Sequence, residues 1–147
     1  MNWKQAINEA RARYMTEHYQ ACKDFGVPAK RYSDTTANGL TACFLDFLKY
    51  SGCYANRINT TGMPRNINGR TVWTKSTTNK GTADIDSIIN GKPVKIEIKI
   101  GADKMSEAQH RERARIERAG GVYIVVKDMQ SFYNWFVNYA AKYGYFD

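Results

Sequence analysis

The chain has 147 residues, 43% of them hydrophobic and 24% charged, which is the size and composition of one globular domain. We find no run of about 18 apolar residues and no apolar segment near Met1, so the sequence predicts neither a membrane span nor a signal peptide. The 22 lysines and arginines outnumber the 14 acids, and this net charge of +8 favours a polyanionic partner such as nucleic acid, although it would also serve solubility alone.

The sequence has three cysteines, Cys22, Cys43 and Cys53, and no two of them have CxxC spacing. An odd count without that spacing argues against a disulfide framework or a zinc knuckle. It indicates a reducing compartment, so we expect a cytoplasmic protein in which at least two of these thiols are small buried hydrophobes.

The first fifty residues predict two helices. Apolar residues recur at three- and four-residue spacing over residues 3–23, and the stretch Gly26-Val27-Pro28 predicts the end of that helix. The polar run at residues 33–36 offers N-cap side chains for a second helix that reaches about Tyr50, with Gly52 just beyond it. The positions expected to face the core are Trp3, Ala6, Ile7, Ala10 and Tyr14 in the first helix and Leu40, Phe44, Phe47 and Leu48 in the second.

The rest of the chain predicts strands, loops and two further helices. Residues 53–59 and 71–75 are predicted to be short strands, residues 60–69 and 76–81 loops, and residues 81–100 a β-hairpin. A capping box from Ser106 to Gln109 begins a helix to about residue 119, and residues 122–127 form a β-branched strand. The final helix carries Phe132, Trp135, Phe136 and Tyr139 at the spacing of a core-facing stripe. These elements predict an α/β fold with a mixed sheet of about four strands flanked by helices, and an extra N-terminal helix against one side.

Three carboxylates interrupt the apolar pattern of the hairpin. If Asn90-Gly91 forms a two-residue type I′ turn, which this dipeptide favours, cross-strand pairing places Asp84 opposite Glu97 and Asp86 opposite Lys95. Side chains that face each other in this way have Cβ atoms roughly 5 Å apart. A type I turn with a bulge also fits the dipeptide and would shift the pairing by one residue.

The pairing of Asp84 with Glu97 brings two like charges together, which destabilises a sheet unless a divalent cation binds between them. An all-oxygen site of this kind suits Mg²⁺ or Mn²⁺ rather than zinc. Lys99 lies on the same face as Glu97, where its ammonium group would orient water or stabilise charge on a phosphate. Two structural explanations stay open: these side chains would form the solvent face of an amphipathic strand, and Asp86 with Lys95 a simple ion pair.

The ordered set Gly81-x-x-Asp84-Ile85, Glu97-Ile98-Lys99 and Ser106-x-x-Gln109, followed by a helix that ends at glycine before a hydrophobic strand, resembles the PD-(D/E)XK nuclease superfamily. More narrowly, it resembles the small phage-type VRR-NUC proteins over about residues 40–136. The resemblance implies a single domain, with a restriction-endonuclease-like core at residues 36–147 and an N-terminal helical extension at residues 1–35. It also implies metal-dependent hydrolysis of phosphodiester bonds by a bacterial or phage-encoded protein.

The motif positions imply a role for each candidate site residue. By resemblance, Asp84 and Glu97 are metal ligands together with the carbonyl of Ile98, and Mg²⁺ or Mn²⁺ is the cofactor. Lys99 corresponds to the catalytic lysine. Gln109 matches the helix glutamine of the family and completes the catalytic set, although the capping box explains the same residue structurally.

Three departures from the family pattern matter. Ala83 replaces the motif proline, which is not a ligand. Asp86 stands where a small or apolar residue is expected, and we interpret it as a bystander. The acid that many members carry early in the first core helix is replaced here by Asn38 or Gly39, which favours one tightly held metal ion over two.

Three basic residues are candidates for contacts with phosphate: Arg57, after the first strand, and Lys75 and Lys80, which flank the loop before Asp84. The leading hypothesis is therefore a DNA endonuclease or exonuclease that acts on branched or junction DNA, with no membrane partner. A homodimer is expected by analogy with junction resolvases, which cut two strands symmetrically. The alternatives are a catalytically weak or inactive nuclease-fold module that binds DNA and a purely structural domain, and RNA stays open as a substrate.

Overall fold

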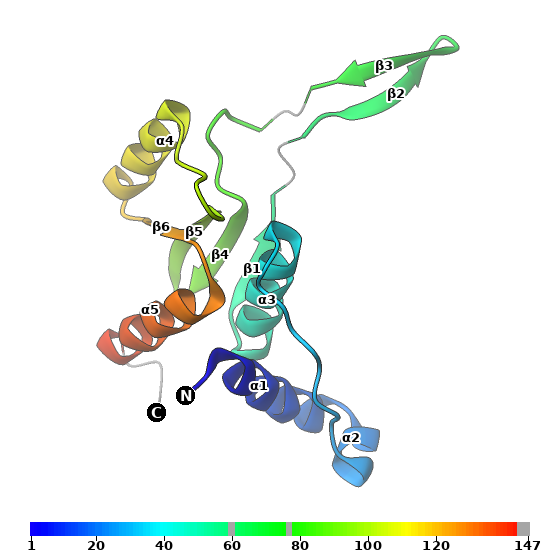
Figure 1. The fold of residues 1–147 in the computed structure, drawn as a ribbon, viewed down its shortest axis with the longest axis vertical. Coiled ribbons are helices and arrows are strands. Elements are labelled where there is room, and N and C mark those ends of the chain that lie inside the picture. The colour runs from blue at the N-terminus through cyan, green and yellow to red at the C-terminus, as the bar shows by residue number, and fades with distance from the viewer. Residues whose placement is uncertain (59–60, 76–77, 144–147) are drawn as a thin grey trace.

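The computed structural model describes residues 1–58, 61–75 and 78–143 (Figure 1). Its elements in chain order are α1 (Trp3–His18), α2 (Gln20–Phe25), α3 (Ala37–Tyr50), β1 (Tyr54–Arg57), β2 (Met63–Ile67), β3 (Arg70–Thr74), β4 (Ile85–Ile89), β5 (Lys92–Ile98), α4 (Glu107–Arg118), β6 (Val122–Val126) and α5 (Met129–Lys142). Within these described ranges, no helix is long and apolar enough to cross a membrane.

A mixed four-stranded sheet forms the centre of the molecule, in the order β1-β4-β5-β6. β4 pairs antiparallel with β1 and β5, whereas β5 and β6 run parallel, because α4 connects them as a crossover. The turn between β4 and β5 has a positive φ at both Asn90 (50°) and Gly91 (73°), as a type I′ turn requires. Ile89 therefore pairs with Lys92, and both the predicted register and the predicted α/β fold with its mixed sheet are confirmed.

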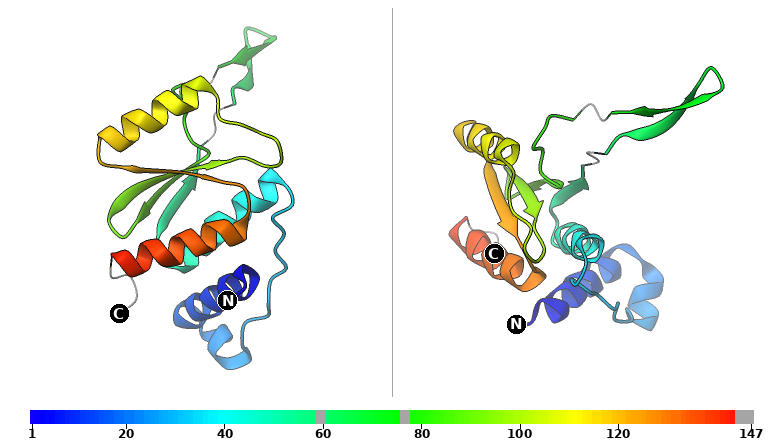
Figure 2. Two further views of the ribbon diagram at one scale, coloured as in Figure 1. Left: turned by 60° about the vertical axis from the view of Figure 1, so that its left-hand side comes forward. Right: turned by 45° about the horizontal axis from the view of Figure 1, so that its top comes forward.

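Helices cover both faces of the sheet (Figures 1 and 2). α4 lies on one face, α3 and α5 lie on the other, and α1 packs on the outside of α3. The main core fills the space between the sheet and the α3/α5 pair, where Phe44 and Phe132 meet edge to face with ring centroids 4.6 Å apart. The predicted apolar stripe of α3 is buried, and in α1 every predicted core position except the half-buried Tyr14 is buried.

Two long-range hydrogen bonds tie the N-terminal part of the chain to α5. Asp34, in the loop before α3, accepts a hydrogen bond from the main-chain N–H of Met129 at 3.1 Å. The main-chain N–H of Trp3 donates to Oε1 of Gln130 at 3.2 Å. The first turn of α5 is therefore held by two segments that lie about a hundred residues earlier in the sequence.

The prediction of one continuous helix over residues 3–23 is wrong. α1 ends at His18, Tyr19 is extended (φ −132°, ψ 120°), and α2 then begins at Gln20. The buried stripe of α1 ends at Ala10, and no residue of α2 is buried, so packing on the core does not require the helix to continue in one direction.

The prediction of a loop over residues 60–69 is also wrong for the part that the structure describes. β2 and β3 form a separate antiparallel sheet, here called the β2–β3 ribbon, which projects away from the rest of the molecule (Figures 1 and 2). Asn68 and Gly69 connect the two strands with φ values of 52° and 75°, another type I′ turn. β1 is shorter than the predicted strand of residues 53–59, whose residue 59 lies outside the described ranges, as do residues 76–77 of the second predicted loop.

Replacement of Phe132 tests this packing. Phe132 is fully buried, so Phe132→Ala should lower the free energy of unfolding by about 3–5 kcal/mol, because it leaves a cavity that the neighbouring rings cannot fill. The matched control is Phe25→Ala, since Phe25 is 89% exposed, and its effect should stay within about 0.5 kcal/mol. Urea unfolding of both variants gives the comparison, and equal effects would contradict the described core.

Candidate active site

Asp84 lies immediately before β4 and is held by both neighbouring strands. Its carboxylate accepts a hydrogen bond from the main-chain N–H of Ile98 at 2.8 Å. Its main-chain carbonyl accepts one from the N–H of Ile58, beyond the end of β1, at 2.8 Å. The side chain of Asp84 is therefore fixed beside the segment of β5 that carries Glu97 and Lys99.

Glu97 is buried on the α4 face of the sheet, with only 2% of its surface exposed. Its Oε1 accepts a hydrogen bond from Nε2 of Gln109 at 2.5 Å. The same oxygen forms an ion pair with Nζ of Lys99 at 3.1 Å. Its Oε2 is buried and has no hydrogen-bond partner among the residues that the structure describes. One carboxylate oxygen is thus fully engaged, whereas the other is enclosed without a partner.

Lys99 is almost as buried as Glu97, at 8% exposure. Besides Glu97, its ammonium group contacts Asp103 at 3.6 Å, and its main-chain N–H donates to the carbonyl of Val126 at 2.9 Å. The interpretation of this face as an ordinary solvent face is therefore wrong at Glu97 and Lys99, because α4 and β6 enclose this end of β5. The interpretation as a solvent face holds only near the Asn90-Gly91 turn, where Lys95 is half-exposed.

Asp86 forms an ion pair with Lys95, its cross-strand neighbour. Their pairing is the one expected from the type I′ turn, and both side chains are partly exposed. The simple ion pair that the sequence left open is therefore confirmed, and the interpretation of Asp86 as a bystander stays a prediction.

Gln109 has both of the roles that the sequence left open. Its side chain and main chain complete a capping box with Ser106, with hydrogen bonds of 2.8 and 3.2 Å, and its Nε2 also reaches Glu97. The start of α4 can lie this close because residue 81 is glycine. A Cβ on Gly81, whose φ is +83°, would lie 2.3 Å from the carbonyl oxygen of Ala108.

Burial and charge shift the pKa values of two groups here. Burial raises the pKa of the Glu97 carboxyl above its ordinary value of 4.5, and the negative charge of Asp84 raises it further. The hydrogen bond and charge of Lys99 oppose the shift, and so does a hydrogen bond from the main chain of Asp84. Burial likewise raises the pKa of Tyr123, and the charges of Glu97 and Asp84 add to this effect. The hydroxyl of Tyr123 is buried without a partner within the described part of the chain.

Sequence reasoning missed Tyr123. It lies within the β-branched segment that becomes β6, where an aromatic residue is expected for packing alone. The signal was its position, because the parallel register pairs Tyr123 with Lys95 and so directs its side chain to the same face as Glu97.

Of the three predicted phosphate-contacting residues, Lys75 and Lys80 lie beside this site, whereas Arg57 lies on the α3 side of the sheet. Arg57 pairs with Ile85 across β1 and β4, and its guanidinium donates to Oδ1 of Asn38 at 3.1 Å. Lys75 and Lys80 line a cavity of about 520 Å³ between the base of the β2–β3 ribbon and the start of α4, where Gln109 also lies. A phosphate backbone in this cavity would therefore pass close to the carboxylates.

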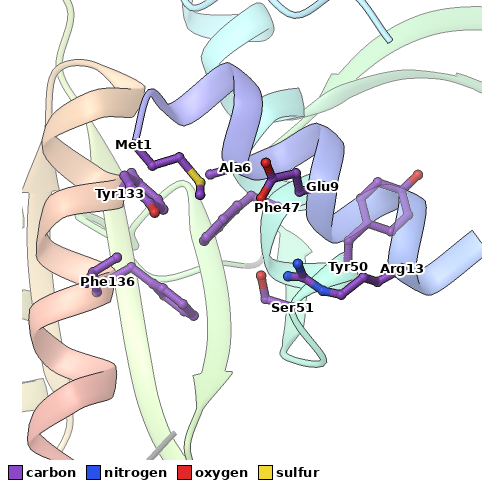
Figure 3. A pocket seen from close by; sticks show the side chains of 10 residues that line it. Met1, Ala6, Glu9, Arg13, Phe47, Tyr50, Ser51, Tyr133 and Phe136 are labelled. Atoms are coloured by element: carbon purple, nitrogen blue, oxygen red, sulfur yellow. The ribbon is translucent and has the colours of Figure 1, made fainter. Parts of the chain in front are cut away.

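The structure also has a cavity of about 540 Å³ far from these residues (Figure 3). α1, α3 and α5 form it, with Phe47, Tyr133 and Phe136 as its apolar walls and Glu9 and Arg13 along α1. Because it lies on the opposite side of the sheet from α4, it has no connection with the candidate chemistry.

No group of three or more His, Cys, Asp or Glu side chains that could hold a metal ion occurs among the described residues. A metal ion at this site would therefore depend on two carboxylates and main-chain oxygen. Comparison of the chain with protein-family models, with curated proteins and with solved structures found no match. The candidate active site thus stands on its own geometry.

The raised pKa of Glu97 predicts how stability depends on pH in metal-free buffer. The folded protein holds a proton on Glu97 at pH values where the unfolded chain has lost it, so stability falls as pH rises from 4.5 through the raised pKa. In Glu97→Gln the side chain of residue 97 cannot titrate. The free energy of unfolding of the native protein, relative to that of this variant, should therefore fall as pH rises from 4.5 through the raised pKa. Each unit of raised pKa corresponds to about 1.4 kcal/mol.

Urea unfolding across the pH range measures this difference. The matched control is Glu107→Gln, because the side chain of Glu107 is 96% exposed and its replacement leaves the buried site intact. A difference that grows in favour of the native protein as pH rises would mean that the ion pair with Lys99 outweighs burial.

Proposed function

We propose that the protein is a metal-dependent nuclease that hydrolyses phosphodiester bonds in DNA, built on a restriction-endonuclease-like core. The observation that carries the proposal is the enclosed carboxylate of Glu97, held by Lys99 and Gln109 beside Asp84. A purely structural ion pair would engage both carboxylate oxygens, since an unpartnered buried oxygen is costly. The enclosed Oε2 is what a site that takes up a cation would contain.

The donor atoms at this site fit a hard divalent cation. The carboxylates of Asp84 and Glu97 and the carbonyl of Ile98 are all oxygen ligands, which Mg²⁺ and Mn²⁺ prefer. When bound, such an ion would act as a Lewis acid toward a phosphate group and balance the negative charge of the two carboxylates.

The residues of the chain have separate roles in this proposal. Gln109 donates to Oε1 of Glu97, which fixes the orientation of the carboxylate and leaves Oε2 available. Lys99 keeps a positive charge close to the reacting phosphate, where it stabilises the negative charge that develops as water attacks phosphorus. Lys75 and Lys80 would hold the flanking phosphates, whereas Arg57 is engaged with Asn38 on the α3 side of the sheet.

DNA is the proposed substrate because Lys75 and Lys80 line the cavity beside the candidate site, on a chain of net charge +8. Branched or junction DNA is the proposed form, and cleavage of a junction on two strands would need two copies of the protein.

One observation favours a second candidate function, a module of the same fold that binds DNA but cleaves it weakly or not at all. The start of α3 carries Asn38 where an acid would be expected, and this side chain is engaged with Arg57. With two carboxylates instead of three, the site would hold one metal ion instead of two, and it would lack the second ion that helps to stabilise the attacking and leaving oxygens.

Cleavage assays distinguish these functions. With Mg²⁺ or Mn²⁺, the protein should cut at least one of a set of labelled flapped, four-way, single-stranded and duplex DNAs, and EDTA should abolish the reaction. Glu97→Gln should lower the rate at least about 100-fold, the usual effect of losing one group that stabilises transition-state charge. Glu107→Gln should stay within twofold of the native rate. Equal cutting by Glu97→Gln would refute the site, and binding without cutting in every metal would establish the second function.

Metal binding has a readout apart from activity. At one hundred times its dissociation constant, a bound ion stabilises the folded state by about 2.7 kcal/mol, which for a chain of this size raises the melting temperature by roughly 5–10 °C. Mg²⁺ or Mn²⁺ should produce this rise in the native protein but not in Glu97→Gln. Equal rises in both proteins would place the ion elsewhere.

A further inference from the structure

The β2–β3 ribbon is an unusual feature for so small a protein. Both strands are exposed along their length, and only Thr74 is partly covered. The two strands pack on each other and have at most marginal contact with the other described helices and strands. An isolated two-stranded ribbon is only marginally stable in water, so a ribbon of this kind is best explained by a partner that it contacts.

The two faces of the ribbon differ in chemistry. Cross-strand pairing of Arg65 with Val72 and of Ile67 with Arg70 places both arginines on one face, together with apolar side chains. The opposite face carries Asn66, paired with Thr71, and Pro64, paired with the 64% exposed Trp73. One face is therefore basic and apolar, and the other offers hydrogen-bonding groups.

Charge indicates the class of partner. From Arg57 to Ala83 the sequence has five basic residues, Arg57, Arg65, Arg70, Lys75 and Lys80, and no aspartate or glutamate. A second copy of the chain also has a net charge of +8, so it would repel the ribbon, whereas a polyanion would attract it.

The dimensions of the ribbon fit the major groove of duplex DNA. That groove is about 12 Å wide and about 8.5 Å deep, and it admits a two-stranded ribbon, whereas the minor groove, at about 6 Å, does not. Each ribbon strand has five residues, or about 16 Å at 3.3 Å per residue, so the tip would reach the base edges.

The base of the ribbon continues into the candidate active site. Gly62 and Trp73 line the same cavity as Lys75, Lys80 and Gln109, and Gln109 contacts Glu97. A duplex held by the ribbon would therefore lie next to the carboxylates, with the lysines between them.

We propose that the β2–β3 ribbon is a DNA-binding arm that enters the major groove of a duplex, with Arg65 and Arg70 contacting phosphates. The inference rests on the proposed function for its choice of DNA as the partner. It concerns binding alone, so it can be tested without cleavage.

The experiment measures binding of a labelled 30-base-pair DNA by fluorescence anisotropy, in EDTA and over a range of salt concentrations. The Arg65→Ala/Arg70→Ala variant should bind at least tenfold more weakly. The slope of log binding constant against log salt should shrink by about 1.8, because each lost phosphate contact contributes about 0.9. The matched control Arg13→Ala/Arg31→Ala removes two exposed arginines from the N-terminal segment and should change affinity less than threefold.

Three outcomes decide between the explanations. Duplex RNA should bind more weakly than duplex DNA, because its major groove is too narrow for the ribbon, and equal affinity would overturn groove binding. Native DNA affinity of the ribbon variant would overturn the arm altogether. Light scattering that shows dimers of the native protein and monomers of the ribbon variant would identify a second copy as the partner instead.

The proposed DNA-binding arm and the proposed active site can be refuted independently. The two proposals are measured on different variants: cleavage on Glu97→Gln, and binding in EDTA on the Arg65→Ala/Arg70→Ala variant. If the ribbon variant loses binding while Glu97→Gln cuts normally, the arm stands and the proposed active site falls. If Glu97→Gln stops cutting while the ribbon variant binds normally, the nuclease stands and the arm falls.

Discussion

The burial of Glu97 and Lys99 is the constraint on which the rest of the candidate site depends. Removal of two charges from water is unfavourable by several kcal/mol for each ion, and their mutual attraction offsets this only when the geometry is well fixed. The fold fixes it from three directions: the hairpin supplies Asp84, β6 accepts the main-chain N–H of Lys99, and α4 supplies Gln109. Each of these contacts comes from a different element, so the site exists only when the sheet and α4 are assembled.

β5 makes the burial of these charges possible because one of its faces packs in the hydrophobic core and the other carries the charged side chains. Ile96 and Ile98 point into the core beneath α3 and α5, and their burial supplies hydrophobic stabilisation that does not involve the charges. Glu97 and Lys99, between and beyond them, point to the α4 face. Hydrophobic burial on one face of β5 therefore offsets the unfavourable desolvation of Glu97 and Lys99 on the other face.

Much of this was predictable from the sequence, and the failures have physical reasons. The Asn90-Gly91 dipeptide predicted the turn and hence the register around Asp84, because that turn has strict backbone requirements. The burial of Glu97 was not predictable, since alternation along a strand shows which residues share a face but not what covers that face. The same dipeptide at Asn68-Gly69 forms the turn of the ribbon, but the polar residues around it favour a loop when the sequence is considered alone. The break at Tyr19 had no signal, because helix propensity there is ordinary.

The hydrogen bonds from Trp3 and to Asp34 change how the first third of the chain should be viewed. The sequence predicts that residues 1–35 are an N-terminal extension outside the core of residues 36–147. In the folded molecule Trp3 and Ile7 belong to the same core as Phe44 and Phe132. A shortened protein beginning near residue 36 would leave one side of α3 bare and α5 without two of its anchors. Loss of this segment would therefore require new apolar cover for α3.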